Sequence, residues 1–342
     1  MSEPTFPQLM RMLMAREDLS REQAHWAFGQ IMDGAWTEAQ VAGLLVGLAA
    51  KGEQAGEIAG AAMAMREHVV PIDAGGADVV DTCGTGGTGL ATFNISTAAA
   101  LVCAGAGVKV AKHGNRTNTR ASGSADVLTA LGVNIDAAPL VVSRCLREAG
   151  VCFCFAVRCH PAMKYAVPVR RALGVRTIFN VLGPLTNPAG ARRQVMGVFD
   201  AALTPMIADV LASLGATRAM VVHAADGLDE FSTTAPTQVS ELRAGEVTTR
   251  TVQPESFHLP RARLNDLLIA SPQESASVIR AVLAGQAGPR RDIVVLNAAA
   301  ALAVADAGAT VADCIQIAQQ SIDSGAAAKS LEKLIRLSNE AV

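Results

Sequence analysis

Aromatic residues are scarce in this chain of 342 residues: they make up 4% of it, with one tyrosine and two tryptophans. Hydrophobic residues still make up 50%, so we expect a large core built from alanine, valine, leucine and glycine. No stretch approaches the roughly 18 uncharged apolar residues that a membrane helix needs. The N-terminal "MSEPTFPQL" also lacks a charged-then-apolar leader. We therefore expect a soluble protein with no membrane partner.

An excess of one charge and a pattern of paired cysteines are also missing. The formal net charge is −2 at pH 7, which argues against a nucleic-acid partner because such proteins usually carry a basic stripe. The cysteines number seven, an odd count, and no C-x-x-C pair occurs. A disulfide framework and a zinc site are therefore not expected. Reduced thiols fit a cytoplasmic location.

Residues 1 to about 68 have the pattern of short amphipathic helices. Ser20 with Gln23 and Thr37 with Gln40 form capping boxes, each before an apolar stripe. A third helix is expected near Ala55–Glu67. Three such helices have little core of their own, so their apolar faces should pack on the rest of the chain or on a second subunit.

From about Ala77 the pattern changes to strands that alternate with helices. "ADVVD" and "VKVA" predict two short strands, and further strands are expected at Val151–Val157, Val195–Phe199 and Ala219–His223. "RAGEVTTRTV" predicts a hairpin, and the chain from about Pro272 is mainly helical. This alternation predicts βαβ units and an α/β fold with a mostly parallel sheet.

The glycines of "DTCGTGGTGLATFNIST" match G-x-G-x-x-G, the pattern of a dinucleotide-binding turn. In that turn the helix opens directly on the glycines, and an acid follows about 20 residues later. Here the next helix is not expected before Ser96, and the next strand ends in Lys112 rather than an acid. A Walker loop is excluded as well, because Leu90 stands where its lysine would follow. The stretch is therefore either a structural turn or a loop that holds another phosphate.

Polar groups around this loop favour the phosphate interpretation. Glycine lets backbone N–H groups approach an anion, and the helix expected at Ser96 adds a positive dipole end. Lys112 and Arg116 end the neighbouring strand, and parallel strands end at one edge of a sheet. The hydroxyl and amide side chains of the loop are those of Thr85, Thr88, Thr92, Asn94, Ser96 and Thr97.

Acidic residues follow a third strand. Asp226, Asp229 and Glu230 lie in "HAADGLDEFS", after the strand "AMVVH". Carboxylates facing a phosphate would repel it unless a metal ion sits between them, and magnesium is the usual choice. A solvated loop is the alternative for this segment taken alone. Together, the three loops predict a magnesium site for a highly phosphorylated ligand.

The combination resembles the anthranilate phosphoribosyltransferase family of tryptophan biosynthesis. The matching segments are "GTGGTGLATFNIST", "VAKHGNR", "SGSADVLTALGV", "HPAMKYAVPVRRALGVRTIFNVLGPLTNP" and "DGLDEFS". The resemblance implies a small all-helical N-terminal domain, residues 1–72, joined by helices around 165–190. It also implies a large α/β domain, residues 73–342, with a central mostly parallel sheet flanked by helices, and a homodimer formed through the N-terminal helices.

The implied reaction transfers the phosphoribosyl group of 5-phosphoribosyl 1-pyrophosphate to the amine of anthranilate. The products are N-(5-phosphoribosyl)anthranilate and pyrophosphate, in the second step of tryptophan synthesis from chorismate. Two Mg²⁺ ions are implied, with Ser96, Asp229 and Glu230 as ligands. Lys112 would stabilise the leaving pyrophosphate, and Arg170 would bind the anthranilate carboxylate through its guanidinium fork. By resemblance the other anthranilate-binding residues are Gly84, His113, Asn115 and Gly183.

The resemblance implies a larger set of residues for the phosphoribosyl pyrophosphate. They are Gly84, Gly87, Asn94, Ser96, Thr97, Lys112 and Ser124, the last also a plausible N-cap. To these we add the hydroxyls of Thr88 and Thr92, and Thr119 and Arg120 in the loop after "KHGNR".

The sequence departs from the family pattern at four positions. Thr88 replaces the usual aspartate of G-T-G-G-D, and Thr119 and Arg120 replace a serine pair. These changes make the corner more positive, and we hypothesise that Arg120 contacts the pyrophosphate and partly replaces a metal contact. Cys159 replaces a polar residue before "HPAMK", which bears on the aromatic amine that fits.

Two other classes of function compete with this prediction. Pyrimidine nucleoside phosphorylases share the fold and a similar glycine loop, but "KHGNR" and "DGLDE" match the transferase pattern. Some relatives have lost the substrate motifs and bind nucleic acid, which disagrees with a net charge of −2 and with the motifs retained here. Transfer to another aromatic amine is a further alternative.

Overall fold

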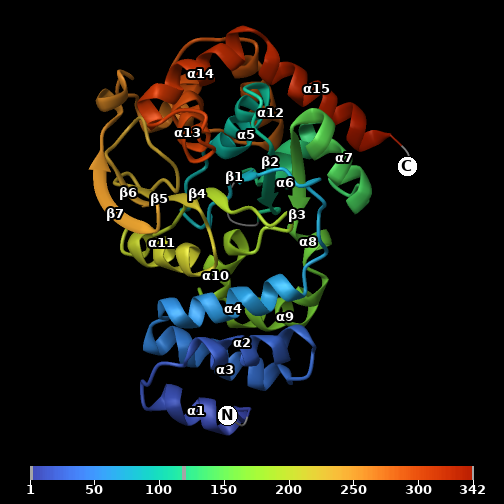
Figure 1. Cartoon of the computed structure of the whole chain (residues 1–342), viewed down its shortest axis with the longest axis vertical. Coiled ribbons are helices and arrows are strands. Elements are labelled where there is room, and N and C mark those ends of the chain that lie inside the picture. The colour runs from blue at the N-terminus through green and yellow to red at the C-terminus, as the bar shows by residue number, and fades with distance from the viewer. Residues whose placement is uncertain (1–2, 118–120, 341–342) are drawn as a thin grey trace.

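A seven-stranded mixed sheet organises the computed structural model, which describes residues 3–117 and 121–340 (Figure 1). The strand order is β3-β2-β1-β4-β5-β6-β7; the first five strands are parallel, and β6 and β7 are antiparallel additions. The predicted mostly parallel sheet is therefore confirmed. The strands are β1 (Val80–Asp81), β2 (Val110–Gly114), β3 (Val151–Phe155), β4 (Arg193–Gly197), β5 (Arg218–Ala224), β6 (Thr237–Arg243) and β7 (Glu246–Val252).

Strand β1 lies at the middle of the sheet, between β2 and β4. The chain passes to one side of β1 to form β2 and β3, and it later returns on the other side to form β4 and β5. A parallel sheet has a crevice at its carboxyl edge where the strand order reverses in this way. The segments that leave β1, β2 and β5 thus meet at one edge, and they are the three polar loops singled out in the sequence.

Helices cover both faces of the sheet. On one face, α13 contacts α5 and strands β1, β4 and β5, and α14, α12 and α15 complete the layer at the top of Figure 1. On the other face, α11 contacts β5, β6 and β7. The helices of the large unit are α5 (Ile95–Gly105), α6 (Ser124–Leu131), α7 (Pro139–Ala149), α11 (Leu203–Ser213), α12 (Pro272–Leu283), α13 (Pro289–Val304), α14 (Val311–Asp323) and α15 (Ala326–Asn339), with short 3₁₀ turns η3 (Pro254–Phe257) and η4 (Leu264–Leu267).

The N-terminal helices form a separate layer beneath the sheet (Figure 1). The predicted capping boxes are present: the Ser20 and Thr37 hydroxyls accept from the N–H groups of Gln23 and Gln40. Helices α2 and α4 cross closely at Gly60, where an added Cβ would lie 2.2 Å from the Arg21 carbonyl oxygen. The bounds are α1 (Phe6–Met14), α2 (Arg21–Met32), α3 (Glu38–Lys51) and α4 (Ala55–Glu67).

Residues 156–185 return from the sheet to this N-terminal layer. Helix α9 contacts α3, and α10 contacts α4, so the segment lies between the two parts of the chain. It carries Arg170 on α9 and Gly183 just after α10. The elements are α8 (Ala156–Cys159), η1 (Pro161–Tyr165), α9 (Val167–Leu173), α10 (Phe179–Leu182) and η2 (Gly183–Leu185).

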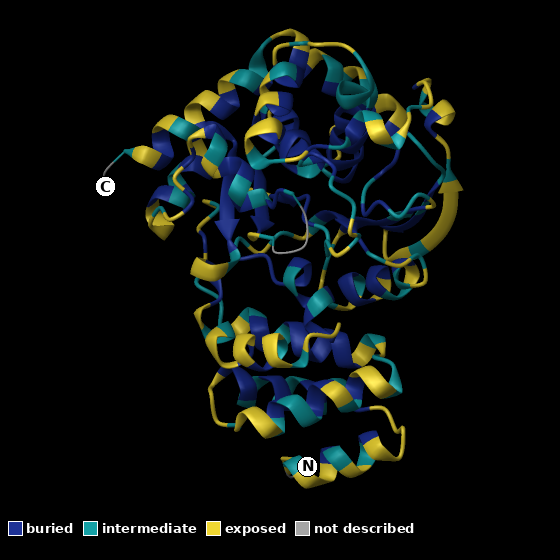
Figure 2. Cartoon of the chain, turned by 180° about the vertical axis from the view of Figure 1, so that it is seen from behind, coloured by how far each residue is buried: buried dark blue, intermediate teal, exposed yellow. Residues whose placement is uncertain are grey.

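Alternate residues of the central strands serve two different cores. Met220 and Val222 of β5 belong to the core around α5 and α13, whereas Val221 belongs to the core of α11 and the N-terminal helices. This is the two-residue period of a strand buried on both faces. Figure 2 shows the contrast with β7, the antiparallel edge strand, which is largely exposed.

Two predicted helix starts were wrong by one residue. Helix α5 begins at Ile95, with Asn94 as its N-cap, rather than at Ser96. Helix α6 has Gly123 as its N-cap, so Ser124 is the first helical residue rather than the cap. Among the described residues, no helix combines the length and the apolar character needed to cross a bilayer.

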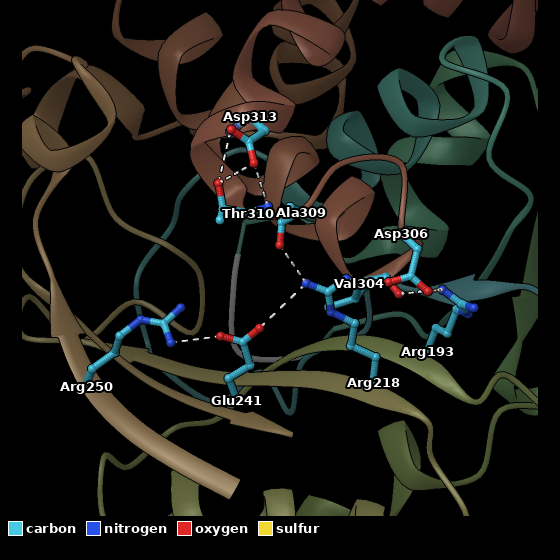
Figure 3. A network of polar contacts seen from close by, with 9 residues as sticks. All are labelled: Arg193, Arg218, Glu241, Arg250, Val304, Asp306, Ala309, Thr310 and Asp313. Carbon is cyan, nitrogen blue, oxygen red and sulfur yellow. Dashed lines mark hydrogen bonds and ion pairs between the residues drawn. The ribbon is translucent and has the colours of Figure 1, made fainter. Parts of the chain in front are cut away.

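Asp306 joins the end of α13 to the starts of two strands (Figure 3). Its carboxylate accepts hydrogen bonds from the guanidinium groups of Arg193, on β4, and Arg218, on β5. Arg218 is buried, with 7% of its side chain exposed, and Glu241 lies 3.8 Å away on its other side. A buried guanidinium needs such partners, since an unpaired buried charge is costly.

Replacing Asp306 with Asn should therefore destabilise the fold. The amide keeps the side-chain shape but leaves the buried Arg218 with one carboxylate fewer, at an expected cost of about 1–2 kcal/mol in the free energy of unfolding. Urea titration measures this change. Asp136→Asn is the matched control, because both acids are 56% exposed but its partner, Arg158, is 61% exposed. The control should change stability by less than about 0.5 kcal/mol, and equal effects would contradict the explanation.

Candidate active site

The glycine loop between β1 and α5 is held at two points. The Thr85 N–H donates to the Gly197 carbonyl at 2.8 Å, and the Gly86 N–H donates to Asp229 Oδ2 at 2.9 Å. Gly86, Gly87 and Gly89 adopt φ values of +66°, +77° and +74°, in the left-handed region that glycine tolerates. The loop is thus fixed to the ends of β4 and β5, while its glycine backbone turns outward.

Asp229 packs directly on the end of β4. A Cβ added to Gly197 would lie 1.7 Å from the Asp229 backbone oxygen, so only glycine allows this approach. The next residues are anchored from behind, because the Phe231 N–H donates to Asn297 Oδ1 at 3.0 Å. Asp226 belongs to the loop itself: Oδ2 accepts from Ser232 Oγ at 2.7 Å. Of the acids after β5, Asp229 therefore adjoins the glycine loop and Asp226 has a structural role.

Lys112 extends from β2 toward the start of α5. Its Nζ lies 3.2 Å from both the Thr82 carbonyl oxygen and Ser96 Oγ, and only 3% of the residue is accessible. No described carboxylate lies within ion-pair distance of this ammonium group. A buried cation in hydrogen-bond contact with Ser96, near a helix N-terminus, makes this corner attractive to an anion.

Asn94 ties three segments together. Its Oδ1 accepts from Ser122 Oγ at 2.7 Å and from Ser275 Oγ at 2.8 Å, while its Nδ2 donates to the Ser122 carbonyl at 3.2 Å. Thr92 is also engaged, in an antiparallel bridge with Leu268. Both residues therefore fix the loop to α12, to the segment before α6 and to the segment after η4.

The remaining residues predicted for the donor substrate have varied surroundings. The Thr88 hydroxyl accepts from the Leu90 N–H at 3.4 Å, and Thr97 Oγ1 is buried without a hydrogen-bond partner. Ser124 lies beside Gly114, at the end of β2. Thr119 and Arg120 lie outside the described residues.

His113, from the end of β2, meets the segment that returns to the N-terminal helices. Its Nδ1 lies 3.0 Å from the Gly183 carbonyl oxygen, and its backbone N–H donates to Asp81 Oδ1 at 3.1 Å. Asn187 Nδ2 donates to the other oxygen of Asp81 at 2.7 Å. Burial raises the pKa of Asp81 to about 6, although the nearby Lys112 opposes this shift. The Asp81 carboxylate thus holds both β2, through the His113 N–H, and the segment after Gly183, through Asn187.

His160 contacts His113, an arrangement that the sequence did not reveal. The two Nε2 atoms lie 3.1 Å apart, and burial lowers the pKa of His113 to about 3 and that of His160 to about 4. Both rings are therefore neutral at pH 7. Because His113 Nδ1 faces a carbonyl, it carries the proton, so His160 Nε2–H must donate to His113 Nε2.

Arg170 offers an available guanidinium on the same side. It lies 5.3 Å from the centroid of the Phe179 ring and forms no hydrogen bond or ion pair with a described residue. Burial lowers the pKa of this group. Asn115, which follows β2, is exposed, and its Oδ1 accepts from the Arg116 N–H at 2.8 Å. The acceptor-side residues thus come from β2 and from the returning segment.

Two groups of side chains offer atoms that can bind a metal ion. Ser96, Asp229 and Glu230 provide oxygen atoms only, which is the donor set that Mg²⁺ prefers. Asp81, Cys83 and His113 have ligand atoms within 4.8 Å of one another, but they offer oxygen, sulfur and nitrogen. Both ring nitrogens of His113 are already engaged with Gly183 and His160. The first group therefore fits magnesium, and the second is better explained as packing beneath the site.

Comparison with known proteins identifies the family. The pattern of the glycosyl transferase family, a/b domain, matches residues 76–328, and that of the helical bundle domain of the same family matches residues 7–69. An anthranilate phosphoribosyltransferase of Thioalkalivibrio sulfidiphilus is 52% identical over 328 residues, which cover 96% of this chain and 97% of the relative. The corresponding protein of Symbiobacterium thermophilum is 51% identical over 326 residues, with 95% and 96% covered.

Solved structures give the same result. The crystal structure of anthranilate phosphoribosyltransferase from Thermus thermophilus matches with a TM-score of 0.92 at 40% identity, covering 97% of this chain and 99% of that one. The enzyme from Saccharomyces cerevisiae, in complex with PRPP and Mg, matches with a TM-score of 0.87 at 29% identity and 98% coverage of both. The chain therefore belongs to the anthranilate phosphoribosyltransferases of the glycosyl transferase family.

Proposed function

We propose that this protein transfers the phosphoribosyl group of 5-phosphoribosyl 1-pyrophosphate to the amine of anthranilate and releases pyrophosphate. The observation that carries the proposal is the similarity to proteins named anthranilate phosphoribosyltransferase. About half of all positions are identical, over nearly the full length of the chain. The phosphorylase and nucleic-acid alternatives have no comparable support among these relatives. The product would be N-(5-phosphoribosyl)anthranilate, an intermediate of tryptophan synthesis.

The donor substrate would lie over the glycine loop, with its pyrophosphate toward Lys112. The buried ammonium and the start of α5 supply positive charge, and the glycine backbone supplies N–H groups. Ser96, Asp229 and Glu230 would hold magnesium as a pair of ions. When bound, magnesium would neutralise charge on the pyrophosphate.

The acceptor would lie between β2 and the returning segment. Arg170 would bind the anthranilate carboxylate, and His113, Asn115, Gly84 and Gly183 would surround the ring and the amine. The amine is neutral at pH 7, so its nitrogen lone pair can attack C1 of the ribose directly. The C1–O bond to pyrophosphate breaks, pyrophosphate takes the electron pair, and the amine proton passes to solvent. Placement of the two substrates in line is then the main catalytic contribution.

The N-terminal layer and the thiols support proposals about assembly and location. Phe6, Trp26 and Trp36 form an aromatic cluster. The ring centroid of Trp36 lies 5.1 Å from that of Phe6 and 5.8 Å from that of Trp26. Met14 and Val46 are exposed on the neighbouring helices α1 and α3. We propose that these helices form a homodimer interface. All seven cysteines are free and buried, which supports a reducing, cytoplasmic location.

Loss of anthranilate fluorescence tests the proposed activity directly. Purified protein with phosphoribosyl pyrophosphate and magnesium should consume anthranilate, and chelation of magnesium should stop the reaction. A parallel assay with thymidine or uridine and phosphate tests the phosphorylase alternative. No fluorescence loss at saturating substrates, or phosphorolysis in its place, would overturn the proposal.

Substitution of Gly197 by Ala should disrupt the proposed magnesium site at Asp229. The new Cβ would collide with the Asp229 backbone and displace its carboxylate. A displacement of about 1 Å can reduce turnover by about 100-fold, and the loss should be smaller at high magnesium concentrations. Initial rates measured against magnesium test this expectation. Gly29→Ala is the control, because it has open space inside helix α2 and should leave the rates unchanged. A Gly197→Ala enzyme with wild-type magnesium dependence would contradict the assignment of Asp229.

The buried histidine pair predicts a specific loss of stability in acid. His160 has a pKa of about 4 in the folded chain against a reference value of 6.5, so the unfolded chain binds more protons between these values. Stability should therefore fall as the pH drops from about 6.5 to 4. His160→Gln should make this dependence shallower by about one proton per molecule. Urea midpoints between pH 4.5 and 7.5 measure the slope, and equal slopes for the two proteins would contradict the neutral-pair description.

A further inference from the structure

Arg176 reaches the glycine loop from the acceptor side of the molecule. Its Nη2 donates to the Gly87 carbonyl at 2.9 Å, and its guanidinium carbon lies 4.3 Å from the centroid of the Phe199 ring. Phe199 follows β4, so the arginine spans three segments that are distant in sequence. Sequence reasoning did not single out this residue.

The backbone that carries Arg176 is itself well fixed. It connects α9 and α10, and the Thr177 N–H donates to Asn180 Oδ1 at 3.0 Å at the start of α10. The same connection separates Arg170 from Gly183, two residues proposed for the acceptor. A hydrogen bond from Arg176 to the glycine loop therefore links the acceptor segment to the donor loop.

The hydrogen bond from Arg176 to the Gly87 carbonyl lies next to backbone N–H groups that can bind a ligand. The N–H groups of Thr85, Gly86 and Leu90 have protein partners, whereas those of Gly87, Thr88 and Gly89 have none among the described residues. Three consecutive free amides in a glycine turn form a nest for an anion. Because the peptide between Gly87 and Thr88 is planar and trans, holding its carbonyl toward Arg176 turns the Thr88 N–H to the opposite side.

The charge of Arg176 is also available. Its guanidinium forms no ion pair with a described carboxylate, and its hydrogen-bond partner, the Gly87 carbonyl, is neutral. Stacking on Phe199 orients the guanidinium plane without neutralising it. The positive charge of Arg176 next to the glycine loop favours an anionic ligand on the loop.

We propose that Arg176 is a positioning residue for the phosphoribosyl donor: by holding the Gly87 carbonyl it orients the free Thr88 N–H of the glycine loop toward the pyrophosphate. The proposal rests on the proposed function. The contacts of the Arg176 guanidinium are with the Gly87 carbonyl and the Phe199 ring, and none is with Arg170, Gly183 or His113. The expected signature is therefore a change in donor affinity rather than in acceptor affinity or in the chemical step.

Steady-state kinetics of Arg176→Ala test this signature. Loss of a hydrogen bond from a charged donor should raise KM for phosphoribosyl pyrophosphate by about 10- to 100-fold, with kcat and KM for anthranilate within about threefold of wild type. Arg171→Ala is the matched control, because Arg171 is an exposed arginine on neighbouring α9 without a hydrogen bond or ion pair to a described residue. Arg176→Lys keeps a positively charged hydrogen-bond donor, so it should recover part of the affinity for phosphoribosyl pyrophosphate.

Two further measurements separate this role from a general loss of structure or of function. Calorimetric titration with phosphoribosyl pyrophosphate and magnesium, without acceptor, should show weaker binding to Arg176→Ala while its urea midpoint stays near that of wild type. An unchanged donor KM, or an equal rise for Arg171→Ala, would overturn the proposal. If Arg176→Ala fails to fold, a wild-type donor KM combined with a raised anthranilate KM in Arg176→Lys would also overturn it. Wild-type protein that binds no donor would instead contradict the proposed function.

Discussion

The parallel alignment of β2, β1 and β4 is the constraint on which the rest of the site depends. It directs the segments after β1, β2 and β5 to one edge of the sheet, so residues more than 100 positions apart come into hydrogen-bond contact. The close approach of Asp229 to Gly197 is possible only in this arrangement, and it places an acid against the glycine loop. The glycines of the loop allow its left-handed conformation, and these fixed neighbours hold it in place.

Buried polar groups beneath the site are arranged so that few of them carry an unbalanced charge. The two histidines are neutral and hydrogen-bonded to each other, and Asp81 is held by Asn187 and by the backbone of β2. Lys112 is the exception, since its ammonium has only neutral partners among the described residues. The opposite charge near this ammonium group is that of Asp81, and an anionic substrate would add another.

The segment between α8 and η2 connects this edge with the N-terminal helices. It packs on α3 and α4, and it also supplies Gly183 to His113 and Arg176 to the glycine loop. The core beneath the sheet is shared between the N-terminal helices, α10 and α11, so this core joins the N-terminal layer to the segment. The proposed donor and acceptor sites are thus connected through the backbone that carries Arg170 and Arg176.

The sequence by itself determined the fold class, the capping boxes, the hairpin and the three polar loops, because these depend on local periodicity and on turn chemistry. It also indicated that Lys112 would lie near Ser96, since parallel strands end at one edge. Helices α5 and α6 begin at Ile95 and Ser124, each one residue away from the predicted start. The reason is that asparagine and glycine can serve as N-caps as well as serine. Only the tertiary structure decided that His160 pairs with His113, that Arg176 holds Gly87, and that Asp306 serves two arginines. These contacts join residues that no local pattern connects, and packing alone selects them.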